Sequence, residues 1–460
     1  MTKDILVESV LTGSEPLTVN YSGDGGNGGL VYLSNPLNSY NGTITVLTNA
    51  IALTSPYALS NATLNAAGTS TSANLIWSGV TSITLGGLSG AGNIALGANQ
   101  LQVGNNDSST EYSGALSGTG SLVKNGSGTF TLTGTNTYSG LTTISGGTLQ
   151  IGDNGTTGTL GTSNVMNNAT LAFNRADVIS DHGMISGTGK LAQIGDGTLT
   201  LSNAHTYSGA TTIESGTLAL TGIGSIANSP SINVSLDALL DVSGRTGGGM
   251  TLASGQTLSG NGAVNGNLTL ASGAKLAPGN SIGSMMFSNS LTLSAGSTTM
   301  LEISKAPLAN DLVNVLGNLT YGGTLVVTNP GAVTLTAGDS FPLFNALSHA
   351  SSFNSLVLPP LGTNLMWDTN GFIVSGTLAV ISTAPPAIDS VATLGDGNFR
   401  LIFSGPTGQD YELRASTNLA LLPVTLWDLL NSGTFGNSPV IFDDLQATNY
   451  PQRFYLLQLP

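Results

Sequence analysis

Two stretches of this chain, Gly118-Thr-Gly-Ser-Leu122 through Leu149 and Gly187-Thr-Gly-Lys-Leu191 through Leu218, are copies of each other. Aligned at an offset of 69 residues without a gap, they share roughly 19 of 32 positions, which is more than a biased composition gives by chance over such a length. The chain therefore contains an internal duplication. Repeated units that cannot bury their own apolar residues fold by stacking on their neighbours, which predicts a repeat architecture.

The residues inside each copy predict short strands with one buried face. In Thr129-Phe-Thr-Leu-Thr133 and in its counterpart Thr198-Leu-Thr-Leu-Ser202, the apolar side chains fall on alternate positions. This alternation is the period of a half-buried β-strand. Thr142-Thr-Ile144 and Gly147-Thr-Leu149 follow in the first copy, separated by turn residues. Each copy therefore contains strand, turn, strand, turn and strand.

A glycine motif marks where these strands turn. Two glycines two positions apart lie between apolar residues in four segments, residues 88–94, 116–122, 185–191 and 258–264. Because glycine adopts positive φ angles without strain, these segments predict corners. A related unit, Thr-Leu followed by glycine, begins at Thr251, Thr269 and Thr292, so we expect about 20 residues in one coil.

The composition supports an all-β chain. With 63 Gly, 7% charged residues and no Cys in 460 residues, the chain is poor in helix formers yet too hydrophobic for a disordered protein. An antiparallel sandwich or barrel is the competing fold, because strands separated by turns look alike in a single sequence. The coil-sized step of the repeats favours a parallel β-solenoid.

The charge and hydropathy patterns argue against two kinds of partner. The formal net charge is −14 with only ten Lys and Arg, so there is no clustered basic face and we expect no nucleic acid partner. No run approaches the roughly 18 apolar residues of a membrane helix, so we expect no membrane-spanning segment. The opening residues, Met1-Thr-Lys-Asp-Ile5, lack the regions of a signal peptide. We therefore expect either a truncated gene start or another export route.

Several of these segments resemble a known family. Gly128-Thr-Phe-Thr-Leu-Thr-Gly-Thr-Asn-Thr-Tyr-Ser-Gly-Leu-Thr-Thr-Ile144 with Gly147-Thr-Leu149, and the copy ending at Leu218, resemble the autotransporter-associated β-strand repeat, also called the passenger-associated transport repeat. Leu276-Ala-Pro-Gly-Asn-Ser-Ile-Gly283 and Asp311-Leu-Val-Asn-Val315 resemble the end of autotransporter passenger domains. The resemblance covers roughly residues 80 to 381.

This resemblance implies a right-handed parallel β-helix passenger that is secreted or exposed on the cell surface, commonly in adhesion or surface-layer roles. We expect the chain to lack the outer-membrane barrel that follows such passengers. About ten tilted strands or more would not fit in the last 80 or so residues. Self-secretion through a barrel of its own is therefore not expected.

We predict four parts of the chain: an irregular N-terminal part of the solenoid (1–80), a β-helix with repeat copies near 118–152 and 187–222 (81–381), a linker (382–388) and a small antiparallel β-sandwich (389–460). The linker prediction rests on Ser382-Thr-Ala-Pro-Pro386, because Pro-Pro cannot continue a sheet ladder. Tyr411-Glu-Leu-Arg-Ala-Ser-Thr-Asn-Leu419 and Arg453-Phe-Tyr455 resemble a C-terminal module of secreted proteins from Verrucomicrobia-type bacteria. That resemblance implies a role in sorting or attachment.

A search for catalytic residue types gives weak candidates only. Ser180, Asp181 and His182 are the residue types of a hydrolase triad, but neighbours on a strand point to opposite faces. His205 stands where the first copy has Asn136, and single histidines of this kind, like His349, are more often capping or surface residues than ligands. We predict no catalytic, cofactor-binding or metal-binding residues, and we expect that the protein is not an enzyme.

A carbohydrate-active enzyme on a β-helix scaffold, a polysaccharide lyase or glycosidase, is the alternative. Such an enzyme needs clustered carboxylates on one exposed face. Five acidic residues in the repeat region show no spacing that assembles such a site: Asp153, Asp177, Asp181, Asp196 and Glu214. Gly23-Asp-Gly-Gly-Asn-Gly-Gly-Leu30 is similar to a calcium-binding nonapeptide, but Gly29 stands where the ligand Asp should be. This segment predicts a turn.

Aromatic residues give the remaining hint of a ligand. Tyr138 and Tyr207 could stack on sugar rings if exposed at equivalent coil positions, but their place before Ser-Gly favours packing at a turn. Trp77, Trp367 and Trp427 are scattered and form no aromatic platform. The ligand-binding residues stay unknown. We predict a non-enzymatic, structural or adhesin-like β-helix protein whose partners are extracellular glycans or cell-surface components.

Overall fold

The computed structural model describes residues 4–20, 29–47, 50–68, 75–181, 183–331, 333–436 and 438–460. The chain forms two compact units. The first contains Met1–Leu301, Asp311–Val326 and Ala346–Leu356, and the second contains Glu302–Asn310, Val327–Asn345 and Val357–Pro460.

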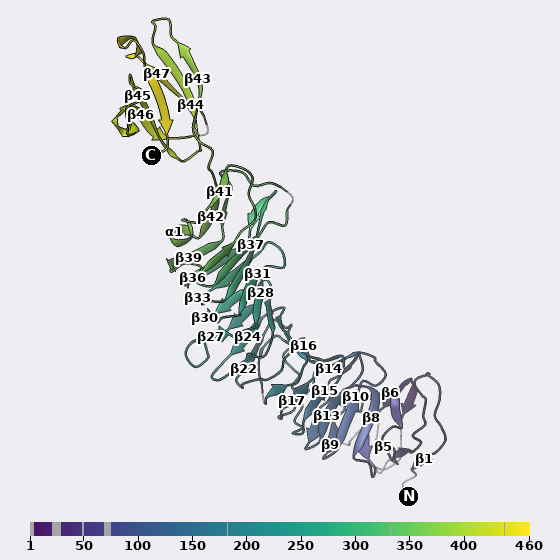
Figure 1. Cartoon of the computed structure of the whole chain (residues 1–460). Helices are drawn as coiled ribbons and strands as arrows, with labels where there is room; N and C mark the ends of the chain where they lie inside the picture. The colour runs from purple at the N-terminus through teal and green to yellow at the C-terminus, as the bar shows by residue number, and fades with distance from the viewer. Residues whose placement is uncertain are drawn as a thin grey trace. The chain divides into compact units, whose positions relative to one another are not determined.

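The first unit is built from short strands that stack into parallel sheets (Figure 1). A four-stranded sheet contains β1 (Ile5–Val7), β3 (Val31–Leu33), β5 (Ile51–Leu53) and β7 (Leu75–Trp77). A nine-stranded sheet contains β2 (Leu17–Val19), β4 (Thr43–Val46), β6 (Leu59–Ala66), β8 (Ser82–Ser89), β10 (Gln100–Val103), β13 (Ser121–Lys124), β15 (Thr142–Ile144), β17 (Val165–Asn167) and β20 (Ile185–Ser186). A pair contains β9 (Ile94–Gly97) and β12 (Leu116–Gly118).

Two larger sheets continue along the chain. One contains β11 (Thr110–Tyr112), β14 (Thr129–Leu132), β16 (Thr148–Gly155), β18 (Thr170–Arg175), β21 (Lys190–Gln193), β23 (Thr211–Ile213), β25 (Ser231–Val234), β28 (Thr257–Gly260), β31 (Lys275–Pro278), β34 (Thr298–Lys305), β37 (Thr324–Thr328) and β40 (Ser355–Val357), with β35 (Leu308–Asn310) beside β34. The other contains β19 (Val178–Ser180), β22 (Thr198–Leu201), β24 (Thr217–Leu220), β26 (Leu239–Asp241), β29 (Ala263–Asn265), β32 (Ser284–Phe287), β36 (Leu312–Thr320), β33 (Leu291–Leu293), β30 (Asn267–Leu270) and β27 (Gly249–Leu252), with β39 (Phe344–Ala350) beside β36.

The strand register gives the length of a coil. Thr129 pairs with Thr148, and Thr148 pairs with Thr170, both in parallel register, so successive coils advance by 19 and 22 residues. This confirms the predicted coil of about 20 residues and the parallel β-solenoid. The antiparallel alternative is wrong for this part of the chain.

The core of the solenoid follows the predicted alternation. Phe130 and Leu132 on β14 are buried, as are Leu199 and Leu201 on β22, whereas the threonines between them are partly exposed. Burying an apolar side chain of this size contributes about 1.5–3 kcal/mol. Each coil supplies only a few such residues, so its stability depends on the coils stacked on either side.

The glycine motif forms corners, as predicted. The first glycine of each motif has a positive φ, between 96° and 107°, at Gly90, Gly118, Gly187 and Gly260. At Gly118 the space beside the backbone is also filled, because an added Cβ would lie 2.7 Å from the backbone of Gly97 in the preceding coil. These corners therefore require glycine for both conformation and close packing.

The two repeat copies lie on different faces of the solenoid. Thr129–Leu132 forms β14 in the thirteen-stranded sheet, but its counterpart Thr198–Leu201 forms β22 in the eleven-stranded sheet. After the first copy, the coils contain three strands each, first β17, β18 and β19 and then β20, β21 and β22, of which β21 and β22 already belong to the second copy. The extra strand shifts the second copy by one face.

The second unit contains three small antiparallel sheets. They are β38 (Ser340–Pro342), β42 (Thr377–Ser382) and β41 (Leu365–Asp368); β43 (Ala387–Thr393), β44 (Phe399–Ser404) and β47 (Val440–Asp444); and β46 (Asp428–Thr434), β45 (Asp410–Ser416) and β48 (Phe454–Gln458). The unit also contains α1 (Phe372–Ser375) and two short 3₁₀ helices, Val424–Leu426 and Ala447–Asn449.

The last two sheets share one apolar core. Leu401 and Phe403 on β44 pack with Tyr411 and Leu413 on β45 and with Phe435, and the rings of Phe403 and Tyr411 meet edge to face with centroids 5.2 Å apart. This is the predicted small antiparallel sandwich. The segment between β42 and β43, residues 383–386, lies within the predicted linker (382–388), whose other residues belong to these two strands. The predicted linker and domain boundaries stay predictions.

Candidate functional site

Asn136 and His205, which correspond in the two repeats, both tie one coil to the preceding one. Oδ1 of Asn136 accepts a hydrogen bond from the backbone N–H of Leu116 at 2.9 Å, and Nδ1 of His205 accepts one from the N–H of Ile185 at 3.0 Å. Both side chains are buried. Since Nδ1 accepts, the ring proton of the neutral imidazole is on Nε2. His205 therefore has the predicted capping role.

The Asp181 carboxylate is enclosed at the same corner. It accepts hydrogen bonds from Ser202 Oγ at 2.9 Å and Asn203 Nδ2 at 2.8 Å, and its Oδ2 lies 3.1 Å from Nε2 of His205, off the line of the N–H bond. The Asp181 and His205 side chains are only 2% and 0% exposed. Burial raises the pKa of the Asp181 carboxyl, but these polar contacts outweigh burial and hold that pKa well below its usual range.

The Asp181 carboxylate therefore makes its polar contacts with residues of the corner itself. Ser180 precedes it on β19 with an exposed side chain, and His182, the third member of the candidate triad, lies outside the described residues. The histidine beside Asp181 is His205, from the next coil. Coil stacking places residues about 20 positions apart in contact, and sequence adjacency does not reveal such a pair.

Tyr138 and Tyr207 are packed inside the solenoid. Tyr138 is 0% and Tyr207 1% exposed, and each phenol is 2.7 Å from a threonine hydroxyl, Thr142 Oγ1 or Thr211 Oγ1. The packing interpretation is confirmed, and the sugar-stacking alternative is wrong for these two residues because no ring face is accessible.

The five acidic residues of the enzyme alternative are used in local contacts or exposed individually. Asp196 accepts hydrogen bonds from Ser215 Oγ at 2.6 Å and Asn154 Nδ2 at 3.0 Å, and Asp177 pairs with Arg175 at 2.7 Å. Asp153 and Glu214 are exposed. Within the described ranges, no group of three or more His, Cys, Asp or Glu side chains could hold a metal ion. The calcium-like segment falls mainly on residues 21–28, outside the described residues.

The other aromatic candidates make local structural contacts. The indole N–H groups of Trp77, Trp367 and Trp427 each donate to a backbone carbonyl at 2.9 Å. His349 stacks on Tyr321, and its Nδ1 is 2.8 Å from the tyrosine hydroxyl. Burial lowers the pKa of His349. These contacts give each side chain a structural partner.

The basic residues of the predicted C-terminal signature also have structural partners. Arg453 forms an ion pair with Asp444 at 2.7 Å, and both side chains are at most 5% exposed. The Tyr455 hydroxyl donates to the same carboxylate at 2.9 Å, and Arg414 pairs with Glu412 at 2.8 Å. These residues fix the sandwich, while the resemblance of this segment to a sorting module stays a prediction.

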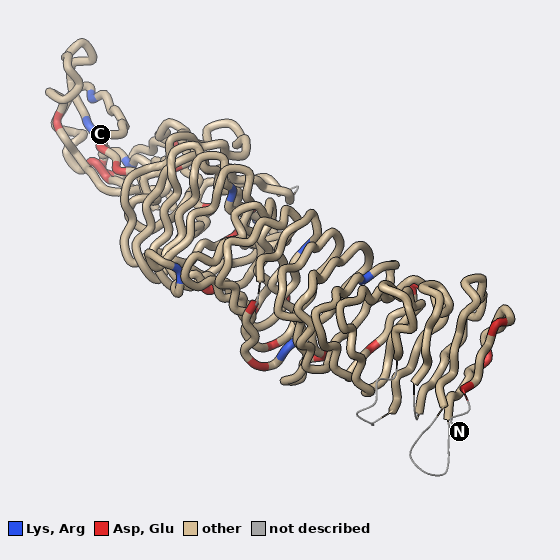
Figure 2. The backbone as a smooth tube through the Cα atoms, turned by 90° about the horizontal axis from the view of Figure 1, so that it is seen from below, with Lys and Arg blue, Asp and Glu red and all other residues tan. Residues whose placement is uncertain are grey.

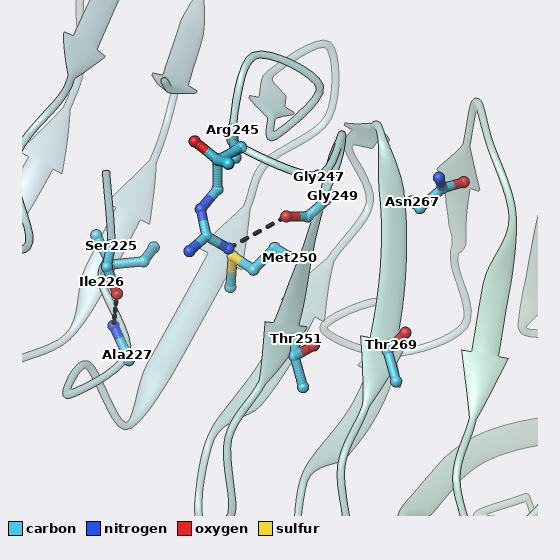
Figure 3. A pocket seen from close by; sticks show the side chains of 11 residues that line it. Ser225, Ile226, Ala227, Arg245, Gly247, Gly249, Met250, Thr251, Asn267 and Thr269 are labelled. Carbon is cyan, nitrogen blue, oxygen red and sulfur yellow. Dashed lines mark hydrogen bonds between the residues drawn. The ribbon is translucent and has the colours of Figure 1, made fainter. Parts of the chain in front are cut away.

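The first unit contains a cavity of about 430 Å³ that sequence reasoning did not identify. It lies where the segment Ser225–Ala227 faces strand β27, and the Arg245 side chain extends into it (Figure 3). Hydroxyl and amide side chains line it, with no carboxylate among the lining residues: Ser225, Ile226, Ala227, Arg245, Thr246, Gly247, Gly249, Met250, Thr251, Asn267 and Thr269. Small-molecule sites typically have volumes of roughly 300–1,000 Å³. We call this cavity the Arg245 pocket.

Arg245 differs from the other arginines of the described chain. Arg175, Arg400, Arg414 and Arg453 each form an ion pair with a carboxylate. Arg245 forms none among the described residues: its Nη1 donates to the backbone carbonyl of Gly249 at 3.2 Å, and its buried Nε has no hydrogen-bond partner. Figure 2 shows how few charged residues the first unit contains. The guanidinium charge of Arg245 is therefore available to a ligand.

The pocket also borders a free sheet edge. Among the residues that the structure describes, strand β27 is the last strand of its sheet and pairs only with β30. The carbonyls of Gly248 and Leu252 accept hydrogen bonds from the β30 side. Because alternate residues of a strand direct their backbone groups to opposite edges, Gly249 and Thr251 direct theirs towards the pocket. The Gly249 carbonyl already accepts a hydrogen bond from Arg245. The backbone groups of Thr251 are therefore the ones on this edge that a ligand in the pocket can reach.

One sequence signal could have drawn attention to this pocket. Arg245 is one of only ten basic residues and lies in the glycine-rich run Gly244-Arg-Thr-Gly-Gly-Gly249. An isolated arginine in such a turn is unusual in a chain with only 7% charged residues. Its free guanidinium depends on spatial neighbours, which the run itself does not reveal.

Stacked coils of about 20 residues with a duplicated strand unit define this chain as a parallel β-solenoid repeat protein. Two segments, residues 122–151 and 191–220, match the family of the passenger-associated-transport-repeat. No curated protein matches the chain. The matched repeats and the solenoid fit an autotransporter passenger-like protein. In the part of the chain that the structure describes, no helix has the length and apolar character needed to cross a membrane.

Proposed function

We propose that this protein is a secreted or cell-surface β-helix that acts as a structural or adhesin-like scaffold and recognises carbohydrate or cell-surface components. The observation that supports this most is the pair of passenger-associated transport repeats on a parallel solenoid. Passenger domains of this kind work outside the cell. A stack of coils also offers a long surface on which ligands can bind.

We also propose that the protein is not an enzyme and has no nucleic acid partner. The most plausible catalytic pair, Asp181 and His205, has almost no exposed side-chain surface and is used to join two coils. A general base must reach the proton that it abstracts. The low content of basic residues also supports a partner other than nucleic acid.

The experiment is a screen of the purified chain against immobilised polysaccharides and glycans, with binding and reducing-end release scored in the same wells, and against intact cells, with binding scored. We expect binding without release. Release that persists after repurification and is lost on heat denaturation would overturn the non-enzymatic part of the proposal. Failure to bind any glycan or any intact cell would overturn the recognition part.

Localisation needs a separate measurement. Intact cells of the source organism are treated with a protease that cannot enter them, and the fate of the chain is followed with an antibody. We expect degradation of the chain while a cytoplasmic marker survives. Protection of the chain in intact cells, with degradation after lysis and no chain in the medium, would contradict the proposed location.

A further inference from the structure

We propose that the Arg245 pocket binds a carboxylate-bearing sugar, a uronic acid residue of an acidic polysaccharide, with the guanidinium of Arg245 on its carboxylate. This inference names a ligand class for the carbohydrate recognition proposed above and rests on it. It depends on three features of the pocket: an available cation, a polar lining and a sheet edge too short for a peptide strand.

The charge of the pocket selects an anion. A partly buried guanidinium without a counter-ion is costly, because the protein replaces only part of its hydration. Arg245 has one backbone acceptor, the Gly249 carbonyl, and a buried Nε without a partner. A carboxylate matches the planar fork of a guanidinium and can accept two hydrogen bonds from it. With a single cation in the lining, the pocket suits a monoanion better than a phosphate dianion.

The rest of the lining suits the hydroxyl groups of a sugar. Ser225, Thr251 and Thr269 supply hydroxyls that donate and accept, and Asn267 supplies an amide. Figure 3 shows Thr251 and Thr269 side by side on adjacent strands, with Asn267 near the end of its strand. Such groups can bind a polyol at several points and so fix its orientation.

The free edge of β27 argues against an acidic peptide as the occupant. An added strand needs several consecutive backbone groups to pair with. Here Arg245 occupies the Gly249 carbonyl, and the N–H of Ala253 donates to Gln256 Oε1 at 2.9 Å. Only the backbone groups of Thr251 remain between these two positions. They can bind one polar group of a compact ligand but cannot hold an extended peptide.

The test measures calorimetric binding of a galacturonic acid trisaccharide to the whole chain at low salt. Its methyl ester serves as the uncharged counterpart, and inorganic phosphate serves as a second anion. Arg245→Gln removes the charge and Arg245→Lys keeps it without the fork. Lys275→Gln, at an exposed lysine on β31, removes the same charge elsewhere. Circular dichroism checks that each variant is folded.

We expect the trisaccharide to bind at least about ten-fold more tightly than its methyl ester, because a charged hydrogen bond contributes about 1.5–3 kcal/mol. Arg245→Gln should weaken binding by a similar factor, Arg245→Lys by less, and Lys275→Gln not at all. If Arg245→Gln does not fold, the Arg245→Lys comparison decides.

Three results would overturn the inference: equal binding of acid and ester, binding unaffected by either Arg245 variant, or binding of phosphate without the trisaccharide. Carbohydrate recognition would still stand if neutral glycans bound in the screen described above. Absence of binding both to the trisaccharide and to every glycan and cell in the screen would remove the proposed recognition function as well.

Discussion

Lys124 and Gln193 occupy the same position in the two repeats, and both side chains donate hydrogen bonds to backbone carbonyls at a coil corner. Nζ of Lys124 donates to Gly126 at 3.0 Å and to Gly146 at 3.2 Å. Nε2 of Gln193 donates to Gly195 at 2.7 Å. The first repeat therefore buries an ammonium group for a task that the second repeat performs with a neutral amide.

We predict that Lys124→Gln changes how stability depends on pH. Burial lowers the pKa of Lys124 from 10.5 to about 8, partly offset by Asp107. Between these two pH values the unfolded chain binds a proton that the folded chain has lost. The free energy of unfolding therefore rises as pH rises from about 8 to 10.5, and this gain disappears as pH falls back towards 8. In the wild type this contribution should be about 1 kcal/mol between about pH 8 and 9.5. Urea unfolding at several pH values measures it.

The Lys124→Gln variant should lack this pH dependence, because it buries no ammonium group. Its free energy of unfolding should therefore exceed that of the wild type most near pH 8, and the difference should shrink as pH rises. Lys124→Met is the matched control, because it removes both the charge and the donor. It should lose the same pH dependence but be less stable than Lys124→Gln at every pH, since the corner carbonyls lose their partner. Identical pH profiles for wild type and Lys124→Gln would exclude this role of the ammonium group.

A second prediction concerns His205. His205→Asn should cost about 1 kcal/mol of unfolding free energy, because the first repeat shows with Asn136 that an amide can accept the bond from the neighbouring coil. His205→Ala should cost about 3 kcal/mol, since it leaves the Ile185 N–H and the Asp181 carboxylate without their contact and opens a cavity. Urea unfolding followed by circular dichroism gives both values. Equal losses in the two variants would show that the hydrogen bond to Ile185 is unimportant.

Much of the solenoid could be predicted because its signals are local. The alternation around Phe130 and Leu132 states which side chains are buried, and the positive φ of Gly118 and Gly187 follows from the glycine motif. The shift of the second repeat to another face was not predictable in this way. It depends on the third strand in the coils near Val178–Ser180, and the apolar period of a strand does not say which sheet the strand joins.

The candidate site was less accessible to sequence reasoning, for a related reason. The contact of Asp181 with His205 arises from coil stacking, which adjacency in sequence does not reveal. The Arg245 pocket exists because Gly249–Leu252 begins a new column of strands and therefore has a free edge. A sequence period predicts strands and turns, but an edge depends on the absence of a strand in the neighbouring coil.

A third prediction concerns alkaline pH. Burial raises the pKa values of Tyr112, Tyr138 and Tyr207 well above the usual value of 10. Above pH 10 the unfolded chain loses phenol protons that the folded chain keeps, so stability falls as pH rises. Phenolate absorbance should therefore increase in two steps, with the second step coinciding with the loss of circular dichroism. Tyr207→Phe should reduce the second step only; a smaller first step instead would contradict the burial of Tyr207.

The last prediction compares two glycines with positive φ in the solenoid. Gly187, at a predicted corner, has a φ of 99°, and an added Cβ would lie 2.2 Å from the carbonyl oxygen of Asn167 in the neighbouring coil. Gly255 has a φ of 84° with nothing within 4 Å of its Cβ position. Alanine at either site pays for the unfavourable φ, about 1–2 kcal/mol. Only Gly187→Ala also forces two coils apart.

Gly187→Ala should therefore lower the free energy of unfolding by about 3 kcal/mol or more, against about 1–2 kcal/mol for Gly255→Ala. Urea unfolding of both variants, followed by far-ultraviolet circular dichroism, provides the comparison. Because the backbone conformations are similar, the difference between the two losses isolates the contact between coils. If the two variants lost the same stability, positive φ alone would explain the glycine motif, and close approach of the coils would have no part in it.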